Sequence, residues 1–384
     1  MKILFATLAF DPRHVSPYPG VNRYSLELAR ALALAGVGVT VVTPLRAELP
    51  ENEIWHGIEI CRLADSKTYA GRLGVIAEGN FVTFALNLRR HPSLYADTDV
   101  LYTNIPMYPV EGSWAPMPIV FFLHHVLRFW QVSDLLTVPF GFYYEHMTLK
   151  AAHTAVVPSV ATRNDVLRQH HLPADKVVVV HHGVNKELFK PSDARTPGQS
   201  GNEIWLMYAG LLDSRKGIRE LIPIFVRLHK RNPQIRLLIV GTGLQEDNVK
   251  KRLVRHGIQK SVRIVRDLTD GELVNCLNSA DIFLFPSRLE GFGLAAVEAM
   301  ACGKPVVAFS NPFTSEIIGE GGMLIPDGDL DRFAASVEML LRNPSRAAEI
   351  GLAGRRRVER EFDWKLSARA HIEVFERALR DGGR

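Results

Sequence analysis

The stretch that most constrains the fold of this chain spans residues 281–309 and reads DIFLFPSRLEGFGLAAVEAMACGKPVVAF. It opens with a short apolar run closed by a proline, which predicts a buried strand. Residues 294–300 have helical composition, and Gly303 with the Lys-Pro pair that follows ends the helix. A second apolar run at 306–309 resumes a strand. This order predicts a βαβ unit, and therefore a parallel sheet.

The loop between this strand and this helix carries the residues best suited to chemistry. Glu290, Gly291, Phe292 and Gly293 lie at the carboxyl end of a strand, where open α/β sheets bind their ligands. The two glycines permit close backbone approach, and the N–H groups at a helix start favour an anion such as phosphate. Glu298 follows Glu290 by eight residues and lies in the helix on a similar side. The pattern predicts an anion site flanked by two carboxylates.

Length, charge and cysteine content narrow the class of protein. The 384 residues exceed one ordinary core, so two domains of roughly 190 residues each are expected. A net charge of +5 suits a polyanionic small ligand or an acidic membrane surface, and is too small to indicate nucleic acid. Three widely spaced cysteines form no metal pattern or disulfide framework, which favours a reducing compartment. No apolar run reaches the roughly 18 residues of a transmembrane helix. We therefore expect a cytoplasmic protein, with peripheral contact at the inner membrane face left open.

The N-terminal end predicts a Rossmann-like unit. A strand at 2–7 and a polar, proline-rich loop precede a helix at 22–34, and a second strand follows at 39–42. The first turn lacks G-x-G-x-x-G, which excludes a nicotinamide-dependent oxidoreductase. Further expected strands lie at 119–123, 154–158, 177–180, 204–208, 236–240 and 262–265.

Taken together, these motifs resemble the retaining glycosyltransferases of the GT-B fold, in the group 1 class of glycosyltransferase family 4. The resemblance is strongest in E-G-F-G-L-x-x-x-E-A-M-A-x-G-x-P-V-V, at residues 290–307. Weaker matches are H-G-V-N-x-x-x-F-x-P at 182–191 and the Lys-Gly pair at 216–217. The resemblance implies an α/β chain of GT-B fold, with two facing Rossmann-like domains and a deep interdomain cleft.

The resemblance also implies where the domains begin and end. An N-terminal domain for the acceptor is expected over residues 1–183, completed by a C-terminal helix at 365–384. A domain for a nucleoside-diphosphate sugar donor is expected over residues 184–364.

In the second half, the resemblance implies roles for particular side chains. Glu290 is expected near the donor sugar, where it holds hydroxyls or stabilises positive charge at the reacting carbon. Glu298 is expected on the ribose hydroxyls. Lys216 is expected to grip the donor diphosphate. It is joined there by backbone groups of the loop and the helix start, at Gly291, Phe292, Gly293 and Leu294.

In the first half, the resemblance singles out two residues. Gly20 matches a glycine that lets the backbone approach the donor phosphates, although Pro19 stands where the family has another glycine. His124 follows the predicted strand at 119–123 and matches a histidine that faces the acceptor side of the cleft.

The chain departs from the family pattern at two further positions. Leu211 stands where the family has an arginine beside the diphosphate, and Arg215, next to Lys216, is the candidate replacement. Arg266 stands in place of a glycine near the nucleotide base. It either contributes to donor selection or faces solvent.

The implied activity is transfer of a sugar from a nucleoside-diphosphate sugar to an acceptor hydroxyl on a glycan, a lipid-linked molecule or a small molecule. The implied mechanism retains anomeric configuration through front-face departure and attack, with no nucleophilic role for Glu290. No metal or other cofactor is expected. Two alternatives remain. A catalytically silent nucleotide-sugar-binding protein is favoured by Leu211, and a GT-B epimerase is not expected to carry the full string at 290–298.

Three other segments leave alternatives open. Two D-x-D strings, at 97–99 and 327–331, have the form of a metal-binding loop, but Asp329 instead predicts the N-cap of a helix, so metal binding is rejected there. Residues 71–92 predict either a domain helix with a basic end or a membrane-surface helix. The aromatic segment 126–144 is either core, or an apolar acceptor groove or membrane-contacting patch.

Overall fold

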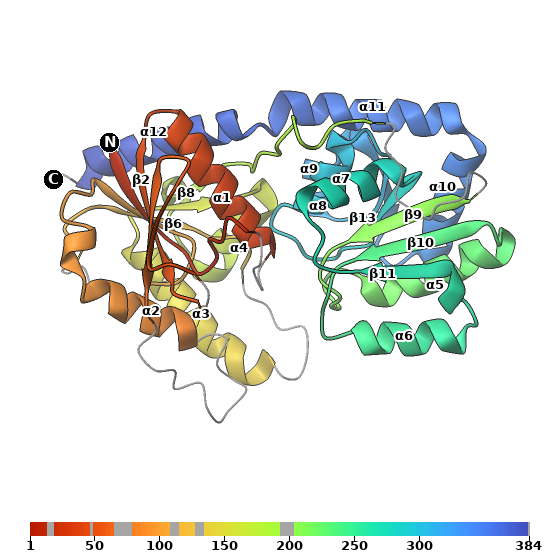
Figure 1. The fold of residues 1–384 in the computed structure, drawn as a ribbon, viewed down its shortest axis with the longest axis horizontal. Coiled ribbons are helices and arrows are strands. Elements are labelled where there is room, and N and C mark those ends of the chain that lie inside the picture. The colour runs from red at the N-terminus through yellow and green to blue at the C-terminus, as the bar shows by residue number, and fades with distance from the viewer. Residues whose placement is uncertain are drawn as a thin grey trace. The chain divides into compact units, whose positions relative to one another are not determined.

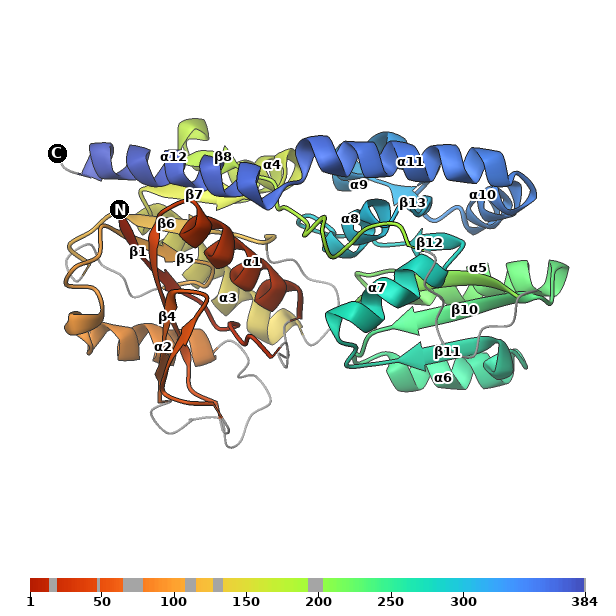
Figure 2. The same cartoon turned by 45° about the horizontal axis from the view of Figure 1, so that its top comes forward.

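The computed structural model describes residues 1–13, 19–46, 49–64, 79–107, 115–126, 134–192 and 203–382. These residues form two compact units (Figures 1 and 2). The N-terminal unit comprises Met1–His182 with Trp364–Arg384, and the C-terminal unit comprises Gly183–Asp363. Each unit is built around its own sheet.

The described residues of the N-terminal unit contain an eight-stranded sheet in the order β3-β4-β2-β1-β5-β6-β7-β8. Only the β3–β4 pair is antiparallel among these strands. The strands are β1 (Lys2–Ala6), β2 (Gly38–Pro44), β3 (Asn52–Trp55), β4 (Ile58–Leu63), β5 (Val100–Thr103), β6 (Ile119–Phe122), β7 (Thr154–Val157) and β8 (Val177–Val179). The helices are α1 (Pro19–Leu34), α2 (Gly79–Arg89), α3 (Asp134–Ala151), α4 (Val160–His170) and α12 (Trp364–Gly382).

The C-terminal unit contains, in its described part, a six-stranded parallel sheet in the order β11-β10-β9-β12-β13-β14, with helices on both faces (Figure 1). The strands are β9 (Ile204–Ala209), β10 (Ile235–Val240), β11 (Val262–Val265), β12 (Ile282–Phe285), β13 (Val306–Ser310) and β14 (Gly322–Pro326). The helices are α5 (Ile218–Arg231), α6 (Glu246–Arg255), α7 (Asp270–Ser279), α8 (Leu294–Ala301), α9 (Pro312–Ile317), α10 (Leu330–Arg342) and α11 (Pro344–Glu361).

Hydrophobic periodicity explains these elements. Helix α5 places its apolar residues three or four positions apart and buries them in the core of the C-terminal unit: Ile218, Leu221, Ile222, Phe225 and Leu228. Strand β12, between β9 and β13, is buried at every position, as expected for a parallel strand covered on both faces. Helix α12, although last in the chain, packs against α1 and adds Trp364 and Phe375 to the core of the N-terminal unit.

The structure confirms the expected Rossmann-like units and the βαβ order at 281–309. It differs from the prediction in that α1 begins at Pro19, three residues earlier than expected, because proline is favoured at the first helical position. Strands β3, β4 and β5 were not predicted, nor were helices α3, α4, α6, α7, α9 and α11. In α2, Phe84 and Leu88 are buried in the core of the N-terminal unit, which favours a domain helix over a membrane-surface helix.

Residues 71–78 and 127–133 lie outside the described part, as do the side chains of 134–140, so the alternatives for 126–144 stay open. Among the helices that are described, none combines the length and the apolarity that a membrane crossing requires.

A buried polar cluster joins α12 to the sheet of the N-terminal unit. The His371 ring donates through Nδ1 to the Ser367 carbonyl at 2.8 Å, so its Nε2 accepts from the Tyr102 hydroxyl at 3.1 Å. The Tyr24 hydroxyl bonds to that of Tyr102. Burial lowers the pKa of His371 to about 4. Burial, assisted by the neighbouring His125, lowers the pKa of His124 to about 3.

These two neutral rings predict acid sensitivity. In the unfolded chain both histidines take up protons near pH 6.5, whereas the folded chain keeps them neutral until the pH approaches their lowered pKa values. The contribution of the two rings to the free energy of unfolding is therefore fully present above pH 6.5. Below that pH it is lost, by about 2 kcal/mol per ring at pH 5. Urea unfolding at pH 7.5 and pH 5 should show this loss, and His371→Gln should reduce it by one ring's share. The exposed His91, changed to Gln, is the matched control, and an equal loss in all three proteins would contradict the assignment.

Candidate functional site

The candidate site lies at the carboxyl edge of the parallel sheet in the C-terminal unit, where the loops after β9, β10 and β12 meet. Glycines make this meeting possible. Gly217 has a φ of 72°, and a Cβ there would lie 1.9 Å from the carbonyl oxygen of Pro286. Gly241 has a φ of 144°, and its Cβ would lie 2.0 Å from the carbonyl oxygen of Gly210. No other residue type fits these contacts, so the loops pack backbone against backbone.

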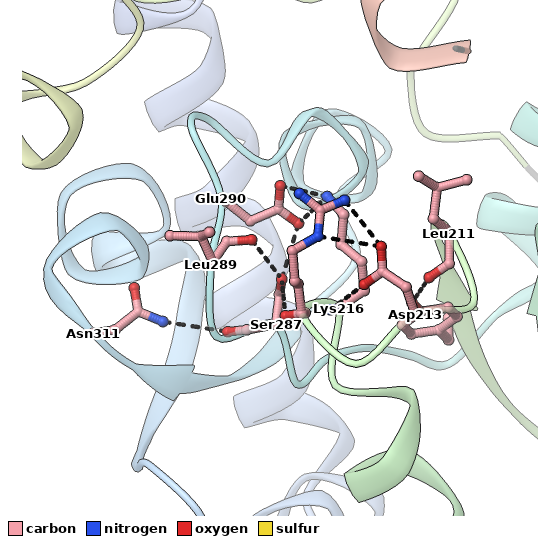
Figure 3. A network of polar contacts seen from close by, with 9 residues as sticks. Leu211, Asp213, Lys216, Ser287, Leu289, Glu290 and Asn311 are labelled. Carbon is pink, nitrogen blue, oxygen red and sulfur yellow. Dashed lines mark hydrogen bonds and ion pairs between the residues drawn. The ribbon is translucent and has the colours of Figure 1, made fainter. Parts of the chain in front are cut away.

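The centre of the site is an ion pair between the loops after β9 and β12 (Figure 3). The Lys216 Nζ lies 2.5 Å from both carboxylate oxygens of Glu290. The Ser287 hydroxyl donates to Glu290 Oε1 at 2.9 Å. The side chains of Lys216 and Glu290 are 22% and 9% exposed, so the pair is largely withdrawn from water. The structure therefore brings together two of the residues that the sequence assigned to the donor.

Asp213 organises the loop that carries Lys216 (Figure 3). Its Oδ1 accepts from the Lys216 backbone N–H at 3.0 Å, and its Oδ2 accepts from Arg215 Nη2 at 2.9 Å. The predicted replacement cation is thus held by a carboxylate two residues before it in the chain. The hydroxyl of the buried Tyr208 donates to the Leu211 carbonyl at 2.8 Å, which braces the start of the same loop. Burial, followed by the charges of Glu290 and Asp213, raises the Tyr208 pKa well above its usual value.

Ser287 anchors the loop that carries Glu290. It is 1% exposed, and its carbonyl accepts from Asn311 Nδ2 at 3.2 Å. Asn311 in turn caps the start of α9, where its side chain accepts from the Thr314 N–H. The Arg288 N–H donates to the Arg215 carbonyl at 2.9 Å, which joins the two loops again. No sequence pattern predicts a role at the site for Ser287, Asp213 or Asn311.

The start of helix α8 completes this edge of the sheet. Gly293 caps the helix with a φ of 80°, and a Cβ there would lie 3.0 Å from the Phe313 ring. Phe292 is buried, with its ring edge-on to Phe362 at a centroid distance of 5.3 Å. Glu298 lies within α8 and is only 5% exposed. A carboxylate buried to this degree is not a solvated surface group.

The remaining predicted site residues, Gly20 and His124, belong to the N-terminal unit. Gly20 is the second residue of α1, and a Cβ at this position would meet nothing within 4 Å, so packing alone does not require glycine. The His124 ring packs edge-on to Tyr24 at 4.9 Å. Its Nε2 is buried and has no hydrogen-bond partner among the described residues.

One further sequence prediction, the helix cap at Asp329, is tested by the structure. Asp329 caps α10 through the Arg332 N–H, as predicted. Its neighbours in the D-x-D string pair with arginines, Asp327 with Arg288 and Asp331 with Arg227. In the described ranges there is no group of three or more His, Cys, Asp or Glu residues that could hold a metal ion.

Arg266, at the end of β11, is half-exposed and pairs with Glu246. Glu246 Oε1 also binds Lys250 Nζ at 2.7 Å. The guanidinium is therefore held by a carboxylate rather than extended into solvent alone.

Comparison with known proteins covers both units. Residues 189–357 match the family model described as "Glycosyl transferases group 1", and residues 18–188 match "Glycosyltransferase Family 4". The O-antigen chain mannosyltransferase B of Escherichia coli is 26% identical over 404 residues, covering 98% of this chain and 99% of that protein. A D-inositol 3-phosphate glycosyltransferase of Kribbella flavida is 26% identical, covering 94% of this chain and 91% of that protein.

Solved structures share the fold. Sucrose-phosphate synthase from Thermosynechococcus elongatus has a TM-score of 0.85 at 22% identity, covering 99% of this chain and 100% of that one. Anabaena Alr3699/HepE in complex with UDP and glucose has a TM-score of 0.76 at 20% identity, covering 98% and 100%. At these identities the likeness establishes the architecture of the chain.

Proposed function

The chain is a glycosyltransferase of the group 1 class of family 4, with the GT-B fold, and from that membership we propose its reaction. It transfers a sugar from a nucleoside-diphosphate sugar to an acceptor hydroxyl, with retention of configuration and without a metal. The observation that carries this proposal is the largely buried Lys216–Glu290 pair beside the start of α8. The complexes of Alr3699/HepE with UDP and with UDP-glucose support the donor class.

The proposed chemistry follows from charge. As the glycosidic bond breaks, the nucleoside diphosphate gains negative charge on its leaving oxygen. The Lys216 ammonium and the N–H groups of Gly293 and Leu294 stabilise that charge in place of a divalent cation. Arg215, held by Asp213 beside Lys216, supplies the second cation that Leu211 cannot.

Glu290 and Glu298 bind different parts of the donor. Glu290, in the loop, binds the sugar hydroxyls and stabilises positive charge at the reacting carbon, but forms no covalent bond to it. Glu298, inside α8, accepts hydrogen bonds from the ribose hydroxyls. His124, kept neutral by its buried position, contributes to the acceptor side. The acceptor is a hydroxyl of a glycan, a lipid-linked molecule or a small molecule, and contact with an acidic membrane surface fits a lipid-linked one.

The test of this function is incubation with a panel of nucleotide sugars in excess chelator, following slow donor hydrolysis. We expect one donor to be cleaved at the same rate with and without chelator. Activity that chelator abolishes and manganese or magnesium restores would refute the metal-independent mechanism. Donor binding without any cleavage would favour the silent binding protein.

Lys216→Ala should weaken binding of the nucleoside diphosphate, because it removes a charge-assisted contact of about 1.5–3 kcal/mol. Calorimetry should record a loss of at least about tenfold. Lys260→Ala, at an exposed position before β11 at the opposite end of the strand, is the matched control. An affinity equal to that of the unmodified protein would move the phosphate site elsewhere.

Glu298→Gln should weaken the bare nucleoside diphosphate and the intact donor by a similar factor, because the ribose is common to both. The amide keeps the volume of the side chain in α8, and a loss of about tenfold corresponds to one charged hydrogen bond. Glu338→Gln, at a partly buried position of α10 where the carboxylate pairs with Arg231, serves as control. A variant that lost donor affinity but kept nucleotide affinity would place Glu298 on the sugar instead.

A further inference from the structure

The carboxylate of Glu290 has few hydrogen-bond partners and little exposure to solvent. Among the described residues its hydrogen bonds come from Lys216 and Ser287, and the side chain is 9% exposed. A carboxylate in such a place depends on its donors, because the loss of one leaves a buried charge unsatisfied. A ligand that draws Lys216 away from Glu290 must therefore supply another hydrogen-bond donor to the carboxylate. A ligand that supplies none binds less tightly.

The Lys216 ammonium has limited capacity. It carries three N–H donors, and the 2.5 Å contacts to both oxygens of Glu290 occupy two of them. A diphosphate that binds Lys216 fully has to displace at least one of these contacts. Phosphate and carboxylate thus compete for the same cation.

We propose that this competition makes the site discriminate between the intact donor and the bare nucleoside diphosphate, with Glu290 as the specificity-determining residue. The inference rests on the proposed function. When the intact donor binds, the sugar hydroxyls donate to Glu290 and replace the contacts that Lys216 withdraws. When the bare nucleotide binds, no hydroxyl is there to replace the contact that Lys216 withdraws, and Glu290 is left with fewer donors than in the free protein. The ion pair therefore weakens the product relative to the substrate and re-forms as the product leaves.

The structure supports this assignment because Glu290 cannot simply follow Lys216. Its oxygen is tied to the buried Ser287, whose carbonyl is fixed by Asn311. The Lys216 backbone is fixed separately by Asp213. With both backbones anchored, the flexible lysine side chain is the part that moves between carboxylate and phosphate.

The test is calorimetry with UDP, GDP and the nucleotide sugar that the protein cleaves, on Glu290→Gln, Lys216→Ala and the double variant. Glu290→Gln should bind the bare nucleotide about tenfold or more tightly, the scale of one lost charged contact, and should bind the intact donor less well. In the Lys216→Ala background the same change should leave nucleotide affinity unaltered, because the competition has been removed. Glu203→Gln, which breaks a pair with Arg236 at the opposite edge of the sheet, should change neither affinity.

The outcomes separate this inference from the function beneath it. If Lys216→Ala weakens the nucleotide but Glu290→Gln leaves it unchanged or weaker, the competition is wrong and the phosphate site stands. If Lys216→Ala has no effect, the phosphate site itself is wrong. Thermal unfolding checks that each variant is folded. Should Glu290→Gln not fold, Glu290→Asp draws the carboxylate back from Lys216 and should tighten nucleotide binding in the same direction.

Discussion

The site depends on a backbone contact that only glycine allows. Gly217 places the loop after β9 directly against the Pro286 carbonyl, at a distance that no Cβ could occupy. Lys216 and Glu290 lie 74 positions apart in the chain, and this contact brings the loops that carry them together. A larger residue at 217 would push the loops apart and break the ion pair, whatever its effect on either loop alone.

The Lys216–Glu290 pair is intermediate between an exposed and a buried ion pair in its contribution to stability. Exposed ion pairs contribute about 0–1 kcal/mol, whereas removing one partner of a buried pair costs about 3–5 kcal/mol. With side chains 22% and 9% exposed, Lys216 and Glu290 lie between these limits. Such a pair orders the two loops, and under the proposed function it is weak enough for a diphosphate to open it. Asp213 and Ser287 limit the motion to one lysine side chain, so opening the pair does not disorder either loop.

Sequence patterns predicted the elements with strong periodicity and the residues with local signatures. The βαβ unit and the α10 cap at Asp329 could be read from short strings, and the resemblance of two further strings to a known family singled out Lys216 and Glu290. Helix α11 could not, because Gly351 and Gly354 lower its helix propensity; in the structure they let the helix approach the backbone of Gly303 and Gly321. Strand β3, half polar at the edge of its sheet, was too short to show a pattern.

The partners within the site were also beyond sequence reasoning. That Lys216 bonds to Glu290 depends on where two distant loops meet, and that Asp213 holds Arg215 depends on a turn whose geometry the string D-S-R-K does not reveal. Ser287 looks like a strand terminator in the sequence, yet its hydroxyl reaches Glu290. Long-range packing decides these contacts, and local patterns do not encode it.

The most direct test of the central claim is a crystal structure of the protein with a bound nucleoside diphosphate. We predict that the Lys216 ammonium lies within hydrogen-bond distance of a phosphate oxygen and has left at least one oxygen of Glu290, while Ser287 still holds that carboxylate. A nucleotide bound elsewhere, with the Lys216–Glu290 pair unchanged, would contradict the account.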